Sequence, residues 1–444
     1  MRTFLHLLAN TLVVSVTNFT VWFAITFYVY LQTRSVFATG TIAGIFLLTT
    51  ALSGIWFGSL VDRYRKKTVM QVSAAASLTL YAAGFVLYQL TPEQRFTEVG
   101  SVSLWAFIVL LMFGVLAGNV RTIALMTLVT ALIAEDRRDR ANGLVGTSTG
   151  ISFLVTSVIS GLLVGAGGMF YVLLLALVVL ALALVHLALT PVRVAPIPPA
   201  ADGTSMVDIR GTIRLVRGVP GLLPLILFSC INNFLGGAFM ALLDAYGLSL
   251  MSVQAWGLLW GALSTGFIIG GLAVAKTGLG ANPVRLLLLV NLVLWGVTCL
   301  FPLTPSVVAL ALGMYVYMLL IPYAEAAEQT ILQKVVPYER QGRVFGFAQS
   351  IEQAASPLTA FLIGPLTQFA FIPSMTDGLW ARLIGGWFGT GADRGIALVF
   401  VLTGIIGLVL TAAALGSRYY RQLSRRYLDG AETVVPTGTV AAEG

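Results

Sequence analysis

The sequence predicts an all-α polytopic membrane protein with twelve transmembrane helices in two pseudo-symmetric six-helix bundles. First, 58% of the 444 residues are hydrophobic, more than the core of a soluble protein can bury. Second, charged residues are only 10% of the chain and collect in short gaps between long apolar runs. Third, one motif recurs at a fixed offset in the second half, which indicates a duplicated bundle.

Twelve apolar runs follow one another along the chain, each near the roughly 20 residues that a helix needs to cross a bilayer. They begin near Leu7, Thr39, Val69, Val102, Ala141, Met169, Gly221, Val253, Pro283, Ser306, Val344 and Gly395. The first run is too long for a signal-peptide core and lacks a small-residue cleavage site, so we expect a retained first helix.

Positively charged residues occupy alternate gaps between these runs. They lie in the segments 63–67, 137–140, 193–217, 276–285, 334–343 and 418–426, whereas the intervening gaps hold Arg34, Arg95, Arg382 and Arg394. Cytoplasmic loops are enriched in lysine and arginine, so an even number of spans places both termini in the cytoplasm. We expect a multi-pass protein of the plasma (inner) membrane. The net charge of +8 is dispersed among the gaps, which argues against nucleic acid as a partner.

A proline-rich gap divides the chain into two halves. We expect an N-terminal six-helix bundle (1–190), a cytoplasmic linker with an amphipathic surface helix (191–220), a C-terminal bundle (221–427) and a disordered tail (428–444). Thr127-Leu128-Val129 and the following Arg137, Arg140 and Gly143 recur 203 positions later as Thr330-Ile331-Leu332, Arg340, Arg343 and Gly346. The halves are therefore expected to be related by duplication.

The gap between the second and third runs carries five charges within Gly58-Ser59-Leu60-Val61-Asp62-Arg63-Tyr64-Arg65-Lys66-Lys67. This segment resembles the loop between helices two and three of the major facilitator superfamily, Gly-x-Leu-x-Asp-Arg-x-Gly-Arg-Lys, with Arg65 where glycine is usual. The resemblance implies a gate in which Gly58, Asp62 and Arg63 meet the end of helix eleven near Arg343. In the second half Val274 stands where Asp62 would map, so only the first half keeps the acid.

The segment from Thr330 to Gly346 contains Leu332-Gln333, Val336-Pro337 and Gly342-Arg343-Val344-Phe345-Gly346. It resembles the superfamily branch of macrolide, tetracycline and catecholate-siderophore exporters. The resemblance implies a secondary transporter that exports small molecules, with proton antiport as a common property of the branch.

One cation is expected in the middle of a span. Arg121 precedes Glu135 by fourteen residues, about 21 Å at helical rise. Ionisable groups are costly inside a membrane, so Arg121 is a candidate for binding an anionic substrate or for lowering the pKa of a nearby acid. The alternative is a structural arginine bonded to backbone carbonyls.

Three carboxyls are candidates for carrying a proton. Glu325 and Glu328 are three residues apart on the tenth span and therefore share a helix face, where two acids titrate as a coupled pair. Alternatively, Glu328 is solvated or paired with Lys334. Glu352, on the eleventh span, fits a network between helices as well as a proton pathway. Asp244 lies about 34 Å along the seventh span, where we expect a solvated helix end.

Polar and aromatic residues on other spans are candidates for lining a substrate cavity, which in superfamily members is surrounded by helices one, four, seven and ten. They are Asn18, Trp22, Asn232, Asn233, Tyr317 and Tyr323. Any one of these residues is more often explained by helix packing than by contact with a ligand.

We therefore expect a proton-coupled secondary active transporter that exports amphipathic or lipophilic small molecules by alternating access, as a monomer in contact with membrane lipid. An exporter or flippase of a siderophore or lysolipid is the alternative, since Arg121 suits an anionic group. A membrane-embedded enzyme or receptor would need a catalytic constellation, but no Ser/His/Asp set, phosphate-cradling glycine loop or metal-ligand spacing occurs. Cys230 and Cys299 lie singly in apolar runs, and neither a cofactor nor a metal is expected.

Overall fold

The computed structural model describes residues 2–33, 36–192 and 208–428, which are almost entirely helical. Twelve helices in these ranges have 18 or more residues. In the first half they are α1 (Arg2–Thr33), α2 (Val36–Arg63), α3 (Lys66–Leu90), α5 (Val102–Leu132), α6 (Arg138–Gly167) and α7 (Met169–Leu189). In the second half they are α9 (Leu222–Leu250), α10 (Val253–Thr277), α11 (Pro283–Leu300), α12 (Val307–Val335), α13 (Gln341–Leu366) and α16 (Ala392–Gly416).

Nine of these helices, within the described residues, are both long and apolar enough to cross a membrane. The other three, α2, α6 and α13, have 28, 30 and 26 residues, which is sufficient length for a span. The sequence-based prediction of an all-helical, twelve-span fold is confirmed. Several helices begin a few residues before the predicted apolar run, as α3 does at Lys66 and α13 at Gln341, because polar residues form their first turns.

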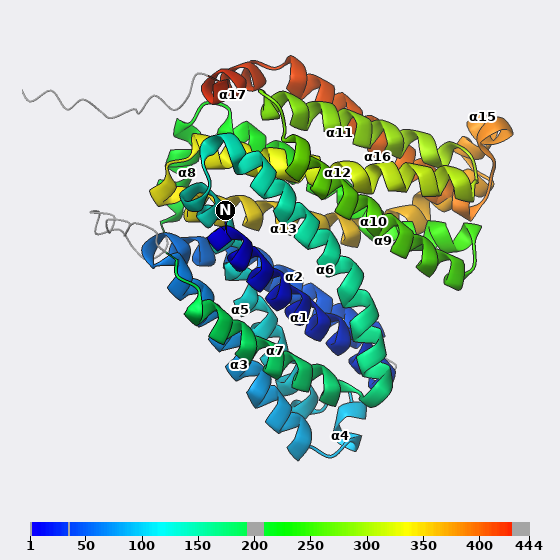
Figure 1. Ribbon diagram of the computed structural model, residues 1–444. Helices are drawn as coiled ribbons and strands as arrows, with labels where there is room; N and C mark the ends of the chain where they lie inside the picture. The colour runs from blue at the N-terminus through cyan, green and yellow to red at the C-terminus, as the bar shows by residue number, and fades with distance from the viewer. Residues whose placement is uncertain (1, 34–35, 193–207, 429–444) are drawn as a thin grey trace, which may run out of the picture.

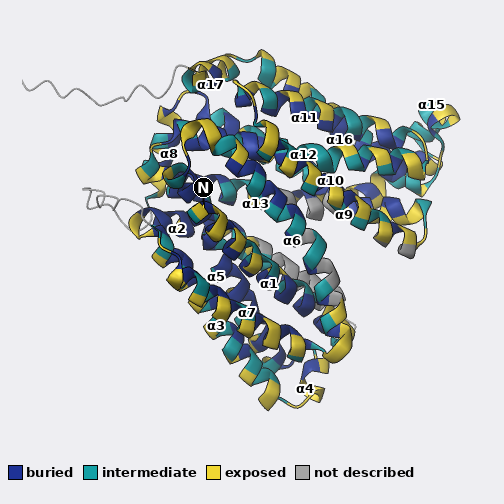
Figure 2. Cartoon of the chain, in the orientation of Figure 1, coloured by how far each residue is buried: buried dark blue, intermediate teal, exposed yellow. Residues whose placement is uncertain are grey.

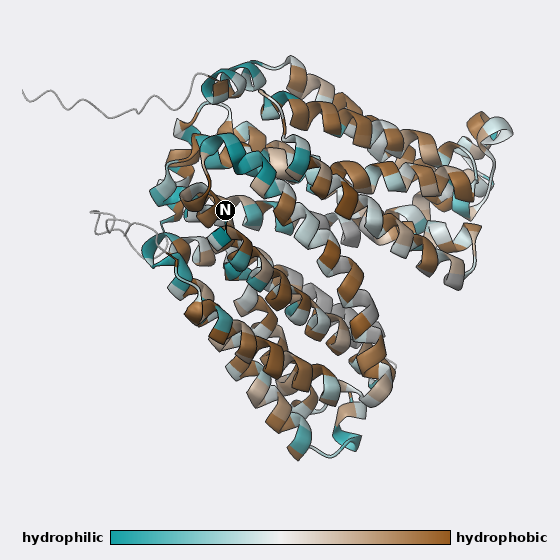
Figure 3. Cartoon of the chain, in the orientation of Figure 1, coloured by the Kyte–Doolittle hydropathy of each residue, from teal (hydrophilic) through white to brown (hydrophobic). Residues whose placement is uncertain are grey.

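Shorter elements connect the long helices. They are α4 (Gln94–Thr97), η1 (Glu135–Arg137), α8 (Ile209–Gly218), η2 (Phe301–Leu303), η3 (Tyr338–Arg340), the π-helical η4 (Thr367–Phe371), α14 (Ile372–Thr376), α15 (Leu379–Phe388) and α17 (Arg418–Leu428). Figure 3 shows that hydrophilic residues gather at the ends of the molecule, on α8, α17 and α4, while the long helices are largely hydrophobic. The predicted disordered tail, apart from Leu428, lies outside the described residues, as does most of the proline-rich gap.

The two halves meet at one end of the molecule and diverge toward the other (Figure 1). We call the end near the N-terminus, where the halves meet, the closed end, and the opposite end the open end. The buried apolar residues follow the same division. One cluster joins both halves, with Val61 and Leu128 packed together with Ile331 and Phe345. Two further clusters are each confined to one half, around Phe107 in the first and Phe400 in the second.

Exposed residues line the outer faces of the long helices, and buried residues concentrate inside each half and at the closed end (Figure 2). Large apolar side chains on these outer faces are exposed, for example Leu52, Leu182 and Val409. An apolar exterior of this kind is compatible with lipid and not with water.

Glycines allow the halves to approach closely at the closed end. A Cβ atom on Gly58 of α2 would lie 2.2 Å from the carbonyl oxygen of Gly342 on α13, and one on Gly346 would lie 2.1 Å from that of Gly54. A second contact of this kind joins α6 to α10, where a Cβ atom on Gly143 would lie 2.5 Å from the backbone nitrogen of Ala275. Small residues permit helix backbones to touch, as at many helix interfaces in membranes.

Candidate functional site

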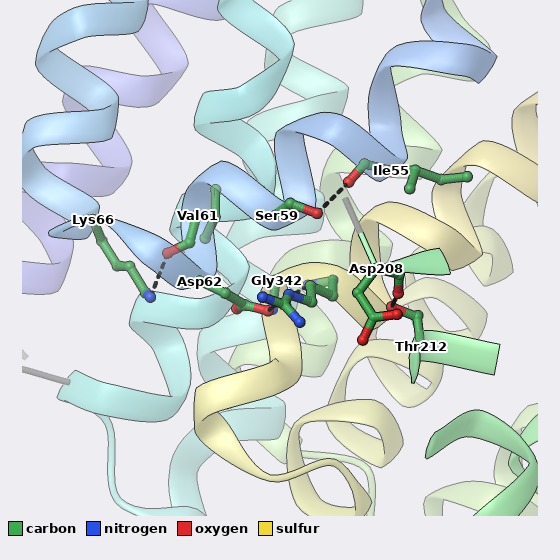
Figure 4. Close-up of polar contacts among 9 residues, drawn as sticks. Ile55, Ser59, Val61, Asp62, Lys66, Asp208, Thr212 and Gly342 are labelled. Carbon is green, nitrogen blue, oxygen red and sulfur yellow. Dashed lines mark hydrogen bonds and ion pairs between the residues drawn. The ribbon is translucent and has the colours of Figure 1, made fainter. Parts of the chain in front are cut away.

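The carboxylate of Asp62 joins the two halves at the closed end. It lies near the end of α2 and accepts two hydrogen bonds from the first turn of α13, from the backbone N–H of Gly342 at 2.7 Å and of Arg343 at 2.8 Å. The first amides of a helix lack partners within the helix and carry its positive dipole end, so an anion there is stabilised. Figure 4 shows Asp62 directed at Gly342.

The other predicted gate residues contribute less to this contact. The guanidinium Nε of Arg343 is 3.9 Å from Asp62 Oδ2, so the backbone amides make the close hydrogen bonds. Arg63 is exposed at the end of α2. Lys66, which belongs to the loop motif but was not among the predicted gate residues, is buried beside Asp62 and donates to the carbonyl of Val61, as Figure 4 also shows. Gly58 provides the space for α13 to approach.

A second acid joins the halves between α6 and α10. Asp139, in the first turn of α6, accepts a hydrogen bond of 2.8 Å from the backbone N–H of Leu279, just beyond α10. The second half has Val274 where Asp62 would map and thus lacks an acid on α10. In the equivalent contact the acid is Asp139, on the opposing helix. We call the Asp62–Gly342 and Asp139–Leu279 contacts the two acid clasps.

Amide side chains connect α6 with α12 between the two clasps. Asn142 donates to Gln333 Oε1 at 2.9 Å and to Thr330 Oγ1 at 2.8 Å, and Gln333 donates to the carbonyl of Met126 at 3.1 Å. Arg138 adds a longer bond of 3.4 Å to the carbonyl of Gln333. All these partners would separate if the closed end opened.

An ion pair borders the same contact. Lys334 Nζ lies 2.9 Å from Glu135 Oε1, and it also lies 4.4 Å from the ring centroid of Tyr427 on α17. The hydrogen bond from Lys334 holds the pKa of the Glu135 carboxyl below its usual value, despite the opposing effect of partial burial. Lys334 is therefore paired with Glu135 and not with Glu328, which was one of the predicted alternatives.

The three candidate proton carriers come together within the second half. Glu328 of α12 accepts a hydrogen bond of 2.7 Å from Ser229 of α9, and it shares a further hydrogen bond with Glu352 of α13. A hydrogen bond between two carboxyl groups requires a proton on one of them. Glu352 is thus part of a network between helices, one of the two alternatives for this residue, and the network includes Glu328 of the predicted acid pair.

Glu325 is exposed and faces the space between the halves. Successive residues of a helix are about 100° apart, so Pro322 and Glu328 lie about 60° to either side of Glu325. Pro322 is 3.4 Å from where a Cβ atom on Gly146 of α6 would lie, and Glu328 points at α9 and α13. The side chain of Glu325 therefore points between the first half, on the side of Pro322, and the helices of its own half, on the side of Glu328.

Arg121 is directed into the interior of the first half. Its side chain is 1% exposed, and it donates to Asn10 Oδ1 on α1 and, at 3.1 Å, to the carbonyl of Met70 on α3. Asn10 in turn donates to the carbonyl of Ala183 at 2.9 Å and bonds to His186 Nδ1 at 3.0 Å. These are the contacts of a structural arginine. Substrate contact by Arg121 stays a prediction, and in this structure the side chain does not face Glu325.

The polar candidates of the first half are tied to their neighbours. Asn18 is buried and accepts a hydrogen bond of 2.8 Å from the hydroxyl of Tyr81. Trp22 is partly exposed and stacks on Phe46 with ring centroids 3.9 Å apart. Trp22 is therefore the better placed of the two for contact with a substrate.

The polar and aromatic candidates of the second half are likewise bonded to, or packed against, neighbouring residues. Asn232 accepts a hydrogen bond of 2.7 Å from Trp295, and Asn233 donates to the carbonyl of Ser229 at 3.0 Å. Tyr317 stacks on Phe239 with centroids 5.6 Å apart, whereas Tyr323 packs against the cluster that joins the halves. Asn233 lies near the acid cluster, since its partner Ser229 also donates to Glu328, but none of these contacts identifies a ligand.

Sequence reasoning missed Ser229, Asp139 and the Asn142–Gln333 pair. Ser229 gives no signal of its own, since it becomes a partner of Glu328 only when α9 packs beside α12. Asn142 lies within the first copy of the repeated motif (127–143) and Gln333 within the second (330–346), so their position was a usable signal. In the described part of the chain no group of three or more His, Cys, Asp or Glu residues could hold a metal ion.

The chain resembles known membrane transporters. A family model described as the Major Facilitator Superfamily matches residues 7–360. No curated protein matches the sequence. Among solved structures, the human organic anion transporter MFSD10 (TETRAN) has a TM-score of 0.69 and 13% identity, covering 91% of this chain and 99% of that chain.

Two further structures share the fold. A bacterial homologue of the iron transporter ferroportin in its outward-facing state has a TM-score of 0.68 and 15% identity, covering 94% of this chain and 100% of that chain. The proton:xylose symporter XylE has a TM-score of 0.63 and 12% identity, covering 92% and 94%. At these identities the structures establish the fold alone. Together with the family match, they show that the chain belongs to the Major Facilitator Superfamily and is a multi-pass membrane transporter rather than an enzyme.

Proposed function

We propose that the protein is a secondary active transporter that exports amphipathic or lipophilic small molecules in exchange for protons. The observation that carries this proposal is the position of Glu325, an exposed carboxyl between the halves beside the Glu328–Glu352 pair. A carboxyl in such a setting can bind and release a proton as its surroundings change. The side of the membrane from which a proton can reach Glu325 depends on whether the closed end is shut.

Alternating access follows from the arrangement of the two halves. The two acid clasps, the Asn142–Gln333 pair and the Lys334–Glu135 ion pair lie at one end and would break together on opening. We propose that this end is cytoplasmic, in agreement with the distribution of lysine and arginine, so that the structure represents an outward-facing state. The protein would then lie in the inner membrane with both termini in the cytoplasm.

The resemblance of the loop motifs supports assignment to the exporter branch of macrolides, tetracyclines and siderophores. A siderophore or lysolipid would need a cation that faces it, and Arg121 was the predicted one. Because Arg121 is bonded inside the first half, the geometry favours the proton-coupled exporter of lipophilic molecules over this alternative.

The experiment is uphill transport in proteoliposomes, driven by an imposed pH gradient without ATP. We expect a lipophilic probe to accumulate against its gradient in the wild type. Glu325→Gln, which mimics a permanently protonated acid, should abolish the uphill phase and leave downhill exchange largely intact. Asp377→Asn, which removes an exposed carboxyl near α15, is the control and should transport normally. Full uphill transport by Glu325→Gln would place the exchanged proton elsewhere.

A further inference from the structure

The short helix α17 begins directly beyond the last span. α16 ends at Gly416 and α17 begins at Arg418, so Ser417 alone separates them. Figure 1 shows α17 at the closed end, on the outer edge of the second half. On the outer face of α16, apolar side chains such as Ile406 and Val409 are exposed, as suits contact with lipid. α17 therefore lies at the depth of the lipid headgroups on that side of the membrane.

The face of α17 that is turned away from the protein is cationic. Its 11 residues include four arginines and no acid. Arg418, Arg421 and Arg425 are exposed, and their spacing of three and four residues places them on one face of the helix. We call these three residues the arginine face. Tyr419 is exposed beside it and accepts a hydrogen bond of 3.1 Å from Arg418. Tyrosine is enriched at membrane interfaces, where its ring contacts the headgroups.

The opposite face of α17 packs on the protein. Leu423 and Ser424 are buried, and Ser424 accepts a hydrogen bond of 2.6 Å from Asn282 at the start of α11. Leu423 lies against the start of α9, where a Cβ atom on Gly221 would be 2.7 Å from the Leu423 Cβ atom. Leu423 also belongs to the apolar cluster that joins the two halves. α17 is therefore part of the closed end and not a loosely attached tail.

The last turn of α17 reaches the contact between the halves. The ring centroid of Tyr427 is 4.4 Å from Lys334 Nζ, and Lys334 pairs with Glu135 of the first half. Burial and the nearby carboxyls of Asp139 and Glu135 raise the pKa of Tyr427 to about 12, so its hydroxyl stays protonated. A helix of the second half thus ends among acids of the first half.

We propose that α17 docks its arginine face on acidic phospholipid headgroups, and that this docking favours the closed end through Tyr427 and Lys334. Each arginine near an anionic membrane surface strengthens the attraction by about fivefold. The position of the helix beside a span, with Tyr419 at the interface, favours a lipid over a soluble anion as the partner. The inference goes beyond the proposed function, since it requires neither a particular substrate nor a coupling ion.

A lipid shifts the equilibrium between the closed and open states only if it binds one of them more tightly. In the closed state, Tyr427 holds Lys334 where it meets Glu135, and the arginine face is turned toward the headgroups. Opening separates Glu135 from Lys334 and removes one of the contacts that keep the end of α17 in place. Acidic lipid should therefore bind the closed state more tightly and slow its opening.

The first measurement is lipid contact at α17. Gln422→Cys, exposed beside the arginine face, carries a fluorophore in full-length protein with Cys230 and Cys299 replaced by serine. The protein is reconstituted in phosphatidylcholine vesicles with a small fraction of spin-labelled phosphatidylglycerol or spin-labelled phosphatidylcholine. We expect phosphatidylglycerol to quench the fluorophore at least about fivefold more strongly, because it is attracted to the arginines.

The second measurement is the opening of the closed end. Ser350→Cys, a buried position on α13, is labelled with the uncharged reagent N-ethylmaleimide in the same cysteine-free background. The vesicles consist of phosphatidylcholine alone or with about 30% phosphatidylglycerol, a charge density that attracts basic helices. Labelling should be several-fold slower in the vesicles that contain phosphatidylglycerol.

Two pairs of variants make the test specific. Arg421→Gln/Arg425→Gln should lose the preference for phosphatidylglycerol and its effect on labelling, whereas Arg95→Gln/Arg382→Gln, which removes two exposed arginines near the open end, should keep both. Tyr427→Leu should keep the lipid preference and lose the effect on labelling. Tyr427→Phe, which retains the ring over Lys334, should keep both.

Equal quenching by the two spin-labelled lipids would overturn the inference even if a variant fails to fold. So would an effect of phosphatidylglycerol on labelling that persists unchanged in Arg421→Gln/Arg425→Gln. Inositol hexakisphosphate added to phosphatidylcholine vesicles tests the soluble alternative. If it slows labelling as much as phosphatidylglycerol does, the arginine face binds a soluble polyanion and the lipid partner is wrong.

Discussion

Asp139 and Gly342 occupy equivalent positions in the two halves, 203 residues apart, and each takes part in a hydrogen bond that joins the halves. Gly342 donates its N–H to Asp62, whereas Asp139 accepts the N–H of Leu279. The duplicated halves therefore keep two equivalent contacts with donor and acceptor exchanged. The loss of an acid at Val274 is offset by an acid on the opposing helix.

The first prediction concerns the stronger of the two clasps. Asp62→Asn keeps the volume but can accept through one oxygen only, so at least one of the two bonds to α13 is lost. The closed end should become less stable by about 1–3 kcal/mol, since a charge-assisted bond is lost in one state only. The measurement is the rate at which a thiol reagent labels Ser350→Cys, a buried position on α13. The background has Cys230 and Cys299 replaced by serine, so that the reagent reacts at this position alone.

Labelling should become several-fold faster without loss of folded protein. Asp139→Asn, which affects a single bond, should have a smaller effect in the same assay. Unchanged labelling in Asp62→Asn would show that the clasp does not hold the closed end.

The second prediction concerns the glycine contact between α2 and α13. Gly58→Ala places a methyl group 2.2 Å from the Gly342 carbonyl oxygen, so the helices must separate. Overpacking of this kind typically costs about 1–3 kcal/mol, and here the cost falls on the closed state. We expect faster labelling of Ser350→Cys and slower transport.

Gly236→Ala is the matched control, since a Cβ atom there would meet nothing within 4 Å. It lies within α9 and adds the same methyl group to a helix interior. Equal effects of the two substitutions would attribute the result to the helix itself and not to the contact.

The third prediction concerns pH. Lys334 holds the pKa of Glu135 below its usual value of 4.5 when the closed end is shut, and opening would return the carboxyl to an ordinary environment. The ion pair thus stabilises the closed end above that usual value, and the contribution is lost as the pH falls through the lowered pKa. Because Glu135 is largely exposed, the effect should be small, about 1 kcal/mol or less.

The measurement is the pH dependence of Ser350→Cys accessibility between about pH 3 and pH 6, with a label whose reaction rate is corrected for pH. Glu135→Gln should remove part of the acid-induced opening and leave the part due to other carboxyls. Identical pH profiles for the wild type and Glu135→Gln would mean that this ion pair contributes nothing to closure.

The fourth prediction concerns topology. Asp136→Cys and Glu339→Cys, both exposed beside the closed end, should react with impermeant reagents only from the cytoplasm. Thr376→Cys, exposed near the open end, should react only from outside. Reaction of all three positions from the same side would contradict the twelve-span arrangement.

The number of spans and the duplication could be predicted because hydropathy and repeats are read locally along the chain. The common face of Glu325 and Glu328 could be predicted from their spacing alone. Ser229 could not, because it reaches Glu328 through the packing of two helices that are far apart in sequence. The depth of Arg121 followed from residue counts, but its direction depends on the rotation of α5 about its own axis, which no spacing rule determines.

The glycine contact also bears on how well the membrane holds an ion gradient. Where the backbones of α2 and α13 touch at Gly58 and Gly342, no side chain separates them and no file of water molecules fits between them. Protons move along such files, so a dry contact at the closed end would prevent a leak through a resting transporter. Larger residues at these positions would force the backbones apart and admit water. Each transporter altered in this way would then dissipate the gradient that drives the other transporters.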